Sequence, residues 1–245
     1  MTHLKVINPN TARAMTEAIG HCARAVAAPS TTVTTVSPSM GPASIESHYD
    51  EALAVPGVLA EIAAGEHAGV DGYVIACFGD PGLHAARELA SGPVVGIAEA
   101  AMHAATLVGR GFSVVTTLSR TVGRAWDLAH QYGFAGACRG VHACDIPVLE
   151  LDDPASDARR IVTRLCAEAA AADGSDSIVL GCAGMASFCA EVSREVGVPV
   201  LDGVAVATKL VEALVSLGLR TSTRGEYALP RPKRYTGLLR EFTVE

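Results

Sequence analysis

The sequence predicts an α/β fold made of two pseudosymmetric lobes, each with a mainly parallel four-stranded sheet flanked by helices. Short apolar runs of strand length alternate along the 245 residues with stretches whose apolar residues recur at helical spacing. Such alternation is typical of a parallel sheet with helical crossovers. In addition, residues 71–79 (DGYVIACFG) and 176–184 (DSIVLGCAG) share one pattern of Asp, apolar run, cysteine and glycine. We therefore expect a duplicated unit whose two halves face one shared site.

The predicted strands are short, rich in β-branched residues and lack alternation, as in strands that are buried on both faces. They are Leu4–Ile7, Thr32–Val36, Tyr73–Ala76, Val94–Val95, Phe112–Val115, Ile178–Leu180 and Val198–Leu201. Helical spacing predicts helices between them. The residues at that spacing are Met15, Ile19, Cys22 and Val26, then Leu53, Leu59 and Ile62, then Val122, Trp126 and Ala129, then Ile161, Leu165 and Ala169.

The repeat extends to the start of each half, because residues 6–11 (VINPNT) parallel residues 114–119 (VVTTLS). This places residues 1–98 and 208–245 in the first lobe and residues 99–207 in the second. The chain is expected to cross between the lobes near residues 97–102 and again near residues 204–210. Residues 224–245 are charged and interrupted by prolines, which predicts a tail or a final packed extension returning to the first lobe.

Composition excludes several classes of protein. The net charge of −7, without any cluster of Lys or Arg, argues against a nucleic-acid surface and for a small-molecule partner. Hydrophobic residues make up 49% of the chain, yet no apolar run is long enough to span a bilayer. Seven cysteines without a close-spaced framework, and no secretory signal, predict a reduced, cytoplasmic protein.

Cys77 and Cys182 occupy the same place in the repeat, directly after a predicted strand. Ligands of open α/β sheets bind at the carboxyl ends of strands, so both thiols should face the ligand. Asp80 and Pro81 predict a helix starting at once, whose N-terminus would lower the pKa of the Cys77 thiol, although the Asp80 carboxylate close by would oppose this. Cysteine is also a common core residue, and that interpretation is kept for the other five. They are Cys22, Cys138, Cys144, Cys166 and Cys189.

Cofactor motifs are missing from the expected places. His142 and Cys144 are close in sequence, but no second pair completes a four-ligand zinc pattern. Residues 8–11 (NPNT) stand where a glycine-rich phosphate loop would follow the first strand. We therefore expect neither a metal nor a nucleotide cofactor.

Polar residues lie at several other predicted strand ends, where they either cap helices and form turns or bind the ligand. They are Asn8, Asn10, Thr11, Thr116, Thr117 and Ser119. Residues 37–50 form a long polar segment after a predicted strand and are expected to shape the ligand mouth. His48 lies in this segment, but a histidine beside a tyrosine is more often exposed or structural, and it is given no catalytic role.

Together these motifs resemble the aspartate/glutamate/hydantoin racemase superfamily, in particular its hydantoin and allantoin racemase branch. The resemblance covers essentially the whole chain. It depends on residues 8–11, 37–46, 77–81, 181–185 and 199–203. It implies two pseudosymmetric lobes with the active site between them, neither metal nor pyridoxal phosphate, and a homo-oligomer.

The resemblance also implies roles for residues. One of Cys77 and Cys182, as thiolate, would remove a proton from the substrate carbon while the other, as thiol, delivers one to the opposite face. Backbone amides after each cysteine would stabilise the negative charge that develops on the substrate carbonyl. The implied substrate-binding residues are Asn10, Ile45, Phe78, Gly79, Thr116, Thr117, Ala183 and Gly184.

The amino-acid racemases of this superfamily carry Asn-Thr after the cysteine, whereas this chain has Phe78-Gly79 and Ala183-Gly184. The difference favours a neutral ring over a free amino acid, and so a 5-monosubstituted hydantoin. Allantoin, a ureido-substituted hydantoin, is the alternative because it would use the same catalytic residues. Another cysteine-dependent isomerase or decarboxylase acting on a diacid is a further alternative, although no Arg lies beside either cysteine motif. A small-molecule binding protein would share the cleft but leaves the matched thiols unexplained.

Overall fold

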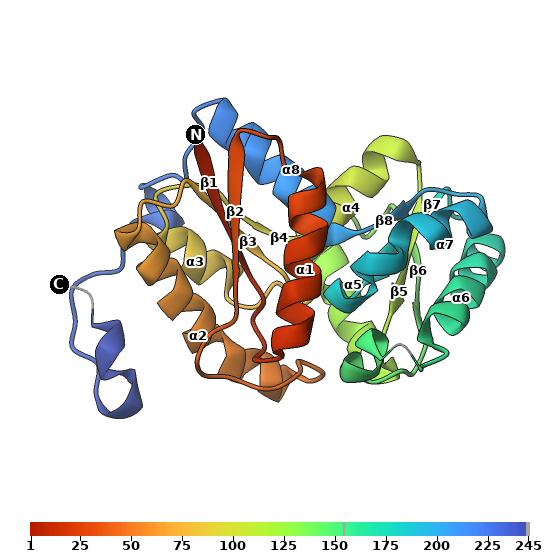
Figure 1. Cartoon of the computed structure of the whole chain (residues 1–245), viewed down its shortest axis with the longest axis horizontal. Coiled ribbons are helices and arrows are strands. Elements are labelled where there is room, and N and C mark those ends of the chain that lie inside the picture. Colours follow the sequence, from red (N-terminus) through yellow and green to blue (C-terminus); the bar gives the residue numbers. More distant parts are fainter. Residues whose placement is uncertain (154, 244–245) are drawn as a thin grey trace.

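The computed structural model describes residues 1–153 and 155–243, and its strands form two separate four-stranded parallel sheets (Figure 1). The first sheet has the order β2-β1-β3-β4, with β1 at Thr2–Ile7, β2 at Thr31–Val36, β3 at Gly72–Ile75 and β4 at Val94–Gly96. The second has the order β6-β5-β7-β8, with β5 at Phe112–Thr116, β6 at Cys138–Ala143, β7 at Ser177–Gly181 and β8 at Val200–Leu201. The two orders are equivalent, and the predicted fold of two similar lobes is confirmed.

Eight α-helices of the described residues cover the sheets. They are α1 (Arg13–Val26), α2 (His48–His67), α3 (Leu83–Leu89), α4 (Ile97–Val108), α5 (Val122–Gln131), α6 (Ala158–Asp173), α7 (Cys189–Val196) and α8 (Gly203–Ser216). Short 3-10 helices add η1 (Ser119–Thr121), η2 (Val148–Asp152), η3 (Ala183–Phe188), η4 (Gly225–Tyr227) and η5 (Gly237–Phe242).

Each sheet is buried between two helical layers because neighbouring residues of a strand point to opposite faces. In the first lobe, Leu4 and Val6 of β1 pack with α1 and α8, whereas Ile7 packs with α2 and α3. In the second lobe, Val114 of β5 packs with α4 and α5, whereas Val115 packs with α6 and α7. The central strands β1, β3, β5 and β7 are therefore largely buried on both faces, as their sequences predict, and most of their residues are apolar; the buried exceptions include Lys5 of β1 and Ser113 of β5.

The edge strands differ from the prediction. Strand β6 (CRGVHA) was not predicted, because it is partly exposed and has no continuous apolar run. Strand β2 (TTVTTV) is exposed at alternate positions instead of buried on both faces. Both strands lie at the outer edge of their sheet, where only one neighbouring strand covers them.

Helices α4 and α8 connect the two lobes. Helix α4 follows β4 of the first sheet and packs against β5 and β7 of the second, while α8 follows β8 and packs back onto β1 and β3. The two helices touch at their N-termini, where a Cβ on Gly203 would lie 2.4 Å from the carbonyl oxygen of Ile97. On this basis we propose the division into residues 1–98 with 208–245 and residues 99–207. Residues 244 and 245 lie outside the described residues.

The segment after α8 returns to the first lobe. Thr221 Oγ1 donates a hydrogen bond to the carbonyl of Gly92 (2.7 Å), and the Tyr227 ring stacks on His84 of α3 with 6.0 Å between ring centroids. Beyond this contact, η5 extends away from the body of the molecule (Figure 1). No helix among the described residues is both long and apolar enough to cross a membrane.

Candidate active site

A pocket of about 190 Å³ lies at the carboxyl ends of the strands, between the two lobes. In the first lobe its walls are Asn10, Met15, residues 45–48, Glu51 and residues 76–79. In the second lobe they are residues 116–117, 120–121 and 124–125, Val148 and residues 181–183. The expectation that a ligand site lies at the carboxyl ends of the strands therefore located the pocket correctly in both lobes.

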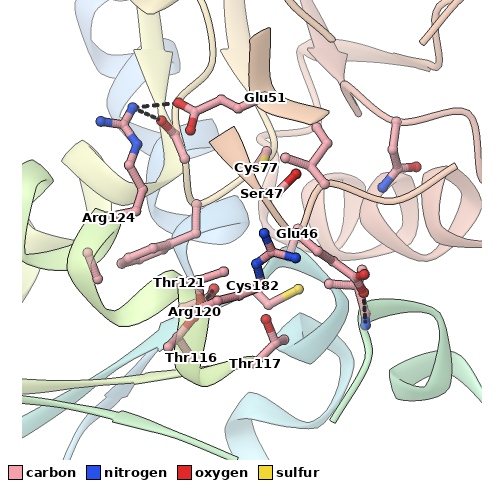
Figure 2. Close-up of a pocket in the computed structure, with 18 of the residues that line it drawn as sticks. Glu46, Ser47, Glu51, Cys77, Thr116, Thr117, Arg120, Thr121, Arg124 and Cys182 are labelled. Atoms are coloured by element: carbon pink, nitrogen blue, oxygen red, sulfur yellow. Dashed lines mark hydrogen bonds and ion pairs between the residues drawn. The ribbon is translucent and has the colours of Figure 1, made fainter. Parts of the chain in front are cut away.

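Cys77 and Cys182 enter this pocket from equivalent strands. Cys77 follows β3 and Cys182 follows β7, and both side chains are partly buried. Figure 2 shows them on opposite sides of the pocket, one from each lobe. None of the seven cysteines, which all belong to the described part of the chain, forms a disulfide.

The expected helix directly after Cys77 is absent, and the expected lowering of its pKa is wrong. Cys77 sits in a turn closed by Asp80 N donating to the Cys77 carbonyl (2.9 Å), and α3 begins only at Leu83. Burial raises the pKa of Cys77 to about 12, with further increases from the charges of Cys182, Glu51 and Asp80. The amide of Gly79 opposes this by hydrogen bonding to the sulfur.

Asp80 caps a different helix from the one expected. Its backbone adopts a left-handed conformation (φ 46°), and its carboxylate accepts hydrogen bonds from Ala98 N (3.1 Å) and Glu99 N (2.9 Å) at the start of α4. The hydroxyl of Tyr132 donates to the same carboxylate (2.7 Å). Asp80 thus points away from the pocket and joins three segments behind it.

Cys182 is followed directly by η3. The first hydrogen bond of that turn runs from Met185 N to the Cys182 carbonyl (3.1 Å), so the amides of Ala183 and Gly184 have no partner within η3. Ala183 lines the pocket, but Gly184 does not, since it packs against Leu151 and Met15. Of the two amides, only that of Ala183 belongs to a residue of the pocket wall.

The other residues implied by the resemblance all line the pocket. Asn10 is buried, and its side-chain amide donates to the Met15 sulfur (3.2 Å), which is a weak acceptor. Thr116 Oγ1 hydrogen bonds Thr121 Oγ1 (3.0 Å), and Thr117 is buried beside Cys182 in Figure 2. Ile45 contributes an apolar wall from the segment before α2.

Phe78 has a second environment besides the pocket. Its ring is buried in the cluster formed by α4, α5 and the second sheet, together with Met102 and Ala125. The residue after Cys77 therefore anchors the first lobe in the core of the second. Its apolar character serves the contact between the lobes as well as the pocket wall.

Four charged residues line the pocket, namely Glu46, Glu51, Arg120 and Arg124 (Figure 2). The sequence predicted none of them individually, although Glu46 lies within the expected mouth segment. No Arg lies beside either cysteine motif in the sequence, yet the pocket contains two arginines, because both come from the segment after β5. A signal was present, since this segment follows Thr116 and Thr117 at a strand end. His48 also lines the pocket, as the first residue of α2.

Three of these charged residues join the lobes. Arg124 Nη2 donates to Glu51 Oε1 (2.6 Å) and to the carbonyl of Gly79 (2.7 Å), and Glu46 Oε1 accepts from Val148 N (2.8 Å). The mouth segment was predicted to extend over residues 37–50, but α2 begins within it, at His48, and the side chain of Ser47 caps that helix by accepting from Asp50 N. The segment from Ile45 to Glu51 therefore bridges the cleft at two points.

The chemistry available in the pocket is that of two thiols with nearby amides and charges. Among the residues that the structure describes, no group of three or more His, Cys, Asp and Glu side chains is placed to hold a metal ion. His142 of β6 instead pairs with Asp173 at the end of α6 (2.7 Å). Two groups that exchange protons with one substrate atom from opposite sides can invert a carbon centre.

Comparison with known proteins connects this geometry to a family. A family model described as Asp/Glu/Hydantoin racemase matches residues 4–211, which include every residue of the pocket wall. The hydantoin racemase of Rhizobium meliloti is 49% identical over 235 residues, 96% of this chain and 98% of that protein. The hydantoin racemase of Pseudomonas sp. (strain NS671) is 45% identical over 239 residues, 98% of this chain and 96% of that one. The structure of allantoin racemase from Klebsiella pneumoniae aligns with a TM-score of 0.97 at 54% identity, covering 99% of both chains.

Proposed function

This chain belongs to the Asp/Glu/hydantoin racemase family and is an isomerase of the racemase class, and we propose that it racemises 5-monosubstituted hydantoins with Cys77 and Cys182 as its two proton-transfer groups. The observation that carries the proposal is one cysteine from each lobe on opposite sides of a single pocket. No other pair of like residues in the pocket wall follows equivalent strands in this way and carries a titratable proton.

In the proposed reaction, the thiolate of one cysteine takes the proton from ring carbon C5, and the C–H electron pair moves into the adjacent carbonyl to form an enolate. The thiol of the other cysteine then gives its proton to C5 from the opposite face, and the enolate returns to a carbonyl. The product is the mirror image of the substrate, and the two sulfurs have exchanged protonation states. The reverse reaction therefore begins with the roles interchanged.

Electrostatic repulsion between the two sulfurs supports a mechanism in which one cysteine is the base and the other the acid. The charge of Cys182 raises the pKa of Cys77, so both sulfurs do not ionise together readily. One thiolate beside one thiol is the state that a two-base mechanism requires. Because the two groups titrate as a coupled pair, kinetic pKa values would belong to the pair and not to either cysteine.

Hydrogen-bond donors around the pocket would stabilise the enolate oxygen as the proton leaves. The amide of Ala183 and the side-chain amide of Asn10 are suited to this task, since neither is engaged by a strong acceptor in the contacts described above. The amides of Phe78 and Gly79 would act similarly in the first lobe, with that of Gly79 shared with the Cys77 sulfur.

Allantoin is a second candidate substrate, and Arg120 favours it. Arg120 lines the pocket and is exposed, and it takes part in none of the ion pairs found among the residues that the structure describes. In Figure 2 it reaches into the pocket, in the space between Ser47 and Cys182 of that view. A guanidinium in this place suits a ureido carbonyl on C5 better than an apolar benzyl group.

The test is incubation of each pure enantiomer of benzylhydantoin and of allantoin in heavy water. Optical rotation should decay to zero from either enantiomer, and deuterium should enter at C5 of the product. Unchanged rotation with all four substrates, after correction for the spontaneous rate, would refute the racemase proposal for these hydantoins.

The cysteine roles are tested by Cys77→Ser and Cys182→Ser. A hydroxyl is a far weaker acid than a thiol, so we expect each variant to lose racemisation by about a thousandfold or more. Exchange of the C5 proton should survive for the enantiomer whose proton faces the remaining cysteine. Cys22→Ala, which changes a cysteine of α1 outside the pocket wall, is the control. Near-normal racemisation in the double variant would show that neither thiol takes part.

A further inference from the structure

We propose that Arg124 and Glu51 form a positioning pair through which contact with the second lobe sets the geometry and charge around Cys77. This inference rests on the proposed two-cysteine reaction and extends it to residues that do not transfer protons themselves. Arg124 comes from α5 of the second lobe, whereas Glu51 comes from α2 of the first. The pair therefore exists only when the lobes are held together.

The contacts of Arg124 converge on the loop that carries Cys77. A single nitrogen, Nη2, donates to Glu51 Oε1 (2.6 Å) and to the Gly79 carbonyl (2.7 Å). The side chains of Arg124 and Glu51 are 27% and 17% exposed, so water screens their attraction less than at an open surface. Arg124 thus holds a carboxylate and a loop carbonyl of the other lobe at once.

Gly79 transmits this contact to the sulfur. Its carbonyl accepts from Arg124, and its amide hydrogen bonds to Cys77, which lowers the pKa of that thiol. A Cβ on Gly79 would lie 3.4 Å from the Glu51 carboxylate, so the loop packs closely against the same pair. Release of Arg124 would loosen the loop that supplies the amide.

The charge of Glu51 acts in the opposite direction. Its carboxylate raises the pKa of Cys77, as do the charges of Cys182 across the pocket and Asp80 in the same loop. Arg124 neutralises Glu51, and the remaining charged or titratable residues of the pocket wall are Glu46, His48 and Arg120. Loss of Arg124 would leave Glu51 uncompensated beside the sulfur.

The Arg124–Glu51 pair acts on Cys77, and the repeat does not supply an equivalent arginine for Cys182. In the repeat, Thr16 corresponds to Arg124, because residues 6–11 correspond to residues 114–119. Thr16 hydrogen bonds within its own lobe, to Asn8 (3.0 Å) and the Ala12 carbonyl (3.0 Å). The two halves of the reaction should therefore respond differently to changes at Arg124.

The decisive experiment measures alkylation of Cys77 and Cys182 by iodoacetamide as a function of pH, with each cysteine followed by mass spectrometry of its peptide. In Arg124→Met, the Cys77 profile should move to higher pH by about one unit, while the Cys182 profile changes less. In Glu51→Gln, a like charge is removed, and the Cys77 profile should move to lower pH. Arg124→Lys keeps a charge and a donor and should restore part of the wild-type profile.

Opposite shifts in Arg124→Met and Glu51→Gln distinguish positioning from a structural role, because simple loss of folding would not reverse the sign. Arg159→Met, which breaks the exposed pair of Arg159 with Glu191 on the second lobe, is the control and should leave both profiles unchanged. Shifts in the same direction, or no shift in either variant, would overturn the inference. Circular dichroism of each variant shows whether the protein is folded.

Kinetics add a second readout. Mirror-image substrates have equal free energies, so kcat/KM must fall equally for both enantiomers of a hydantoin in Arg124→Met. Exchange of the C5 proton is not bound by this equality, and we expect it to fall about tenfold more for the enantiomer deprotonated by Cys77. Equal losses of exchange would contradict the inference. If no hydantoin is racemised but the alkylation shifts are seen, the proposed function fails while the positioning pair stands.

Discussion

At the scale of single residues, Arg120 and Arg124 lie one helical turn apart yet have different environments. Arg124 is held by Glu51 and the Gly79 carbonyl, whereas Arg120 is exposed and forms none of the ion pairs found among the described residues. An arginine already paired with the protein cannot pair with the substrate without losing those bonds. We therefore propose Arg120, and not Arg124, as the residue that selects the group attached to C5 of the proposed substrate.

We predict that Arg120→Met lowers kcat/KM for allantoin by about tenfold to a hundredfold, because a hydrogen bond to a charged donor contributes roughly 1.5 to 3 kcal/mol. The same variant should change kcat/KM for benzylhydantoin by less than about threefold. Initial rates on both substrates, measured by polarimetry, provide the comparison. Equal losses on both would mean that Arg120 supports the pocket without discriminating between substituents.

At the scale of elements, the start of α4 depends on a residue outside that helix. Gly96, its N-cap, has no side chain, and Asp80 takes over the cap by accepting from the amides of Ala98 and Glu99. A Cβ on Gly96 would lie 2.2 Å from the Asp80 carboxyl carbon, so glycine is needed for this approach. The sequence after Cys77 thus predicts that Asp80 caps α3, whereas in the structure Asp80 caps α4.

The pH dependence of stability should reveal this buried carboxyl. Burial raises the pKa of Asp80 to about 6, while hydrogen bonds from Tyr132 and the α4 amides lower it. Between about pH 4 and pH 6 the folded protein then binds more protons at Asp80 than the unfolded chain does, so the free energy of unfolding falls as pH rises.

The free energy of unfolding of the wild type, relative to Asp80→Asn, should therefore decrease by on the order of 2 to 3 kcal/mol across this window. Urea denaturation at several pH values measures the difference. In Tyr132→Phe the loss of a donor should extend the decrease to higher pH. A difference that stays constant with pH would show that Asp80 keeps an ordinary acidity in the folded protein.

At the scale of the whole molecule, the lobes are joined where α4 and α8 meet. The chain passes from the first sheet into α4 and returns from the second sheet through α8, and Gly203 allows the two N-termini to touch. Phe78 adds a contact from the first lobe to the core of the second. The pocket is lined by residues of both lobes, so its width depends on contacts between them.

Gly203→Ala should destabilise the protein by about 1 to 3 kcal/mol, because the new methyl group would lie 2.4 Å from a backbone oxygen of Ile97 that cannot move aside easily. Urea denaturation measures the change. Gly123→Ala on α5 is the matched control, since no atom lies within 4 Å of its added Cβ, and it should stabilise by up to about 1 kcal/mol. If both alanine variants were equally stable, the close approach of α4 and α8 would not be a constraint.

The sequence by itself determined the two-lobed α/β fold and family membership, both now confirmed. It also singled out Cys77 and Cys182, as well as Asn10, Thr116 and Thr117, whose catalytic and binding roles stay predictions. These inferences succeed because apolar periodicity and strand ends are local properties, and parallel strands bring their carboxyl ends to one edge whatever the details of packing. The partly exposed strand β6 was missed for the same reason, since it lacks that local signal.

Only the tertiary structure decided which charges surround the thiols. Glu46, Glu51, Arg120 and Arg124 are distant in sequence from both cysteine motifs, and they meet at the pocket because the lobes face each other. The raised pKa of Cys77 has the same origin, because burial and the charges of other segments outweigh the amide of its own loop. Local sequence patterns specify which side chains lie at the end of a strand. The residues of the other lobe that those side chains meet across the cleft depend on how the two lobes pack.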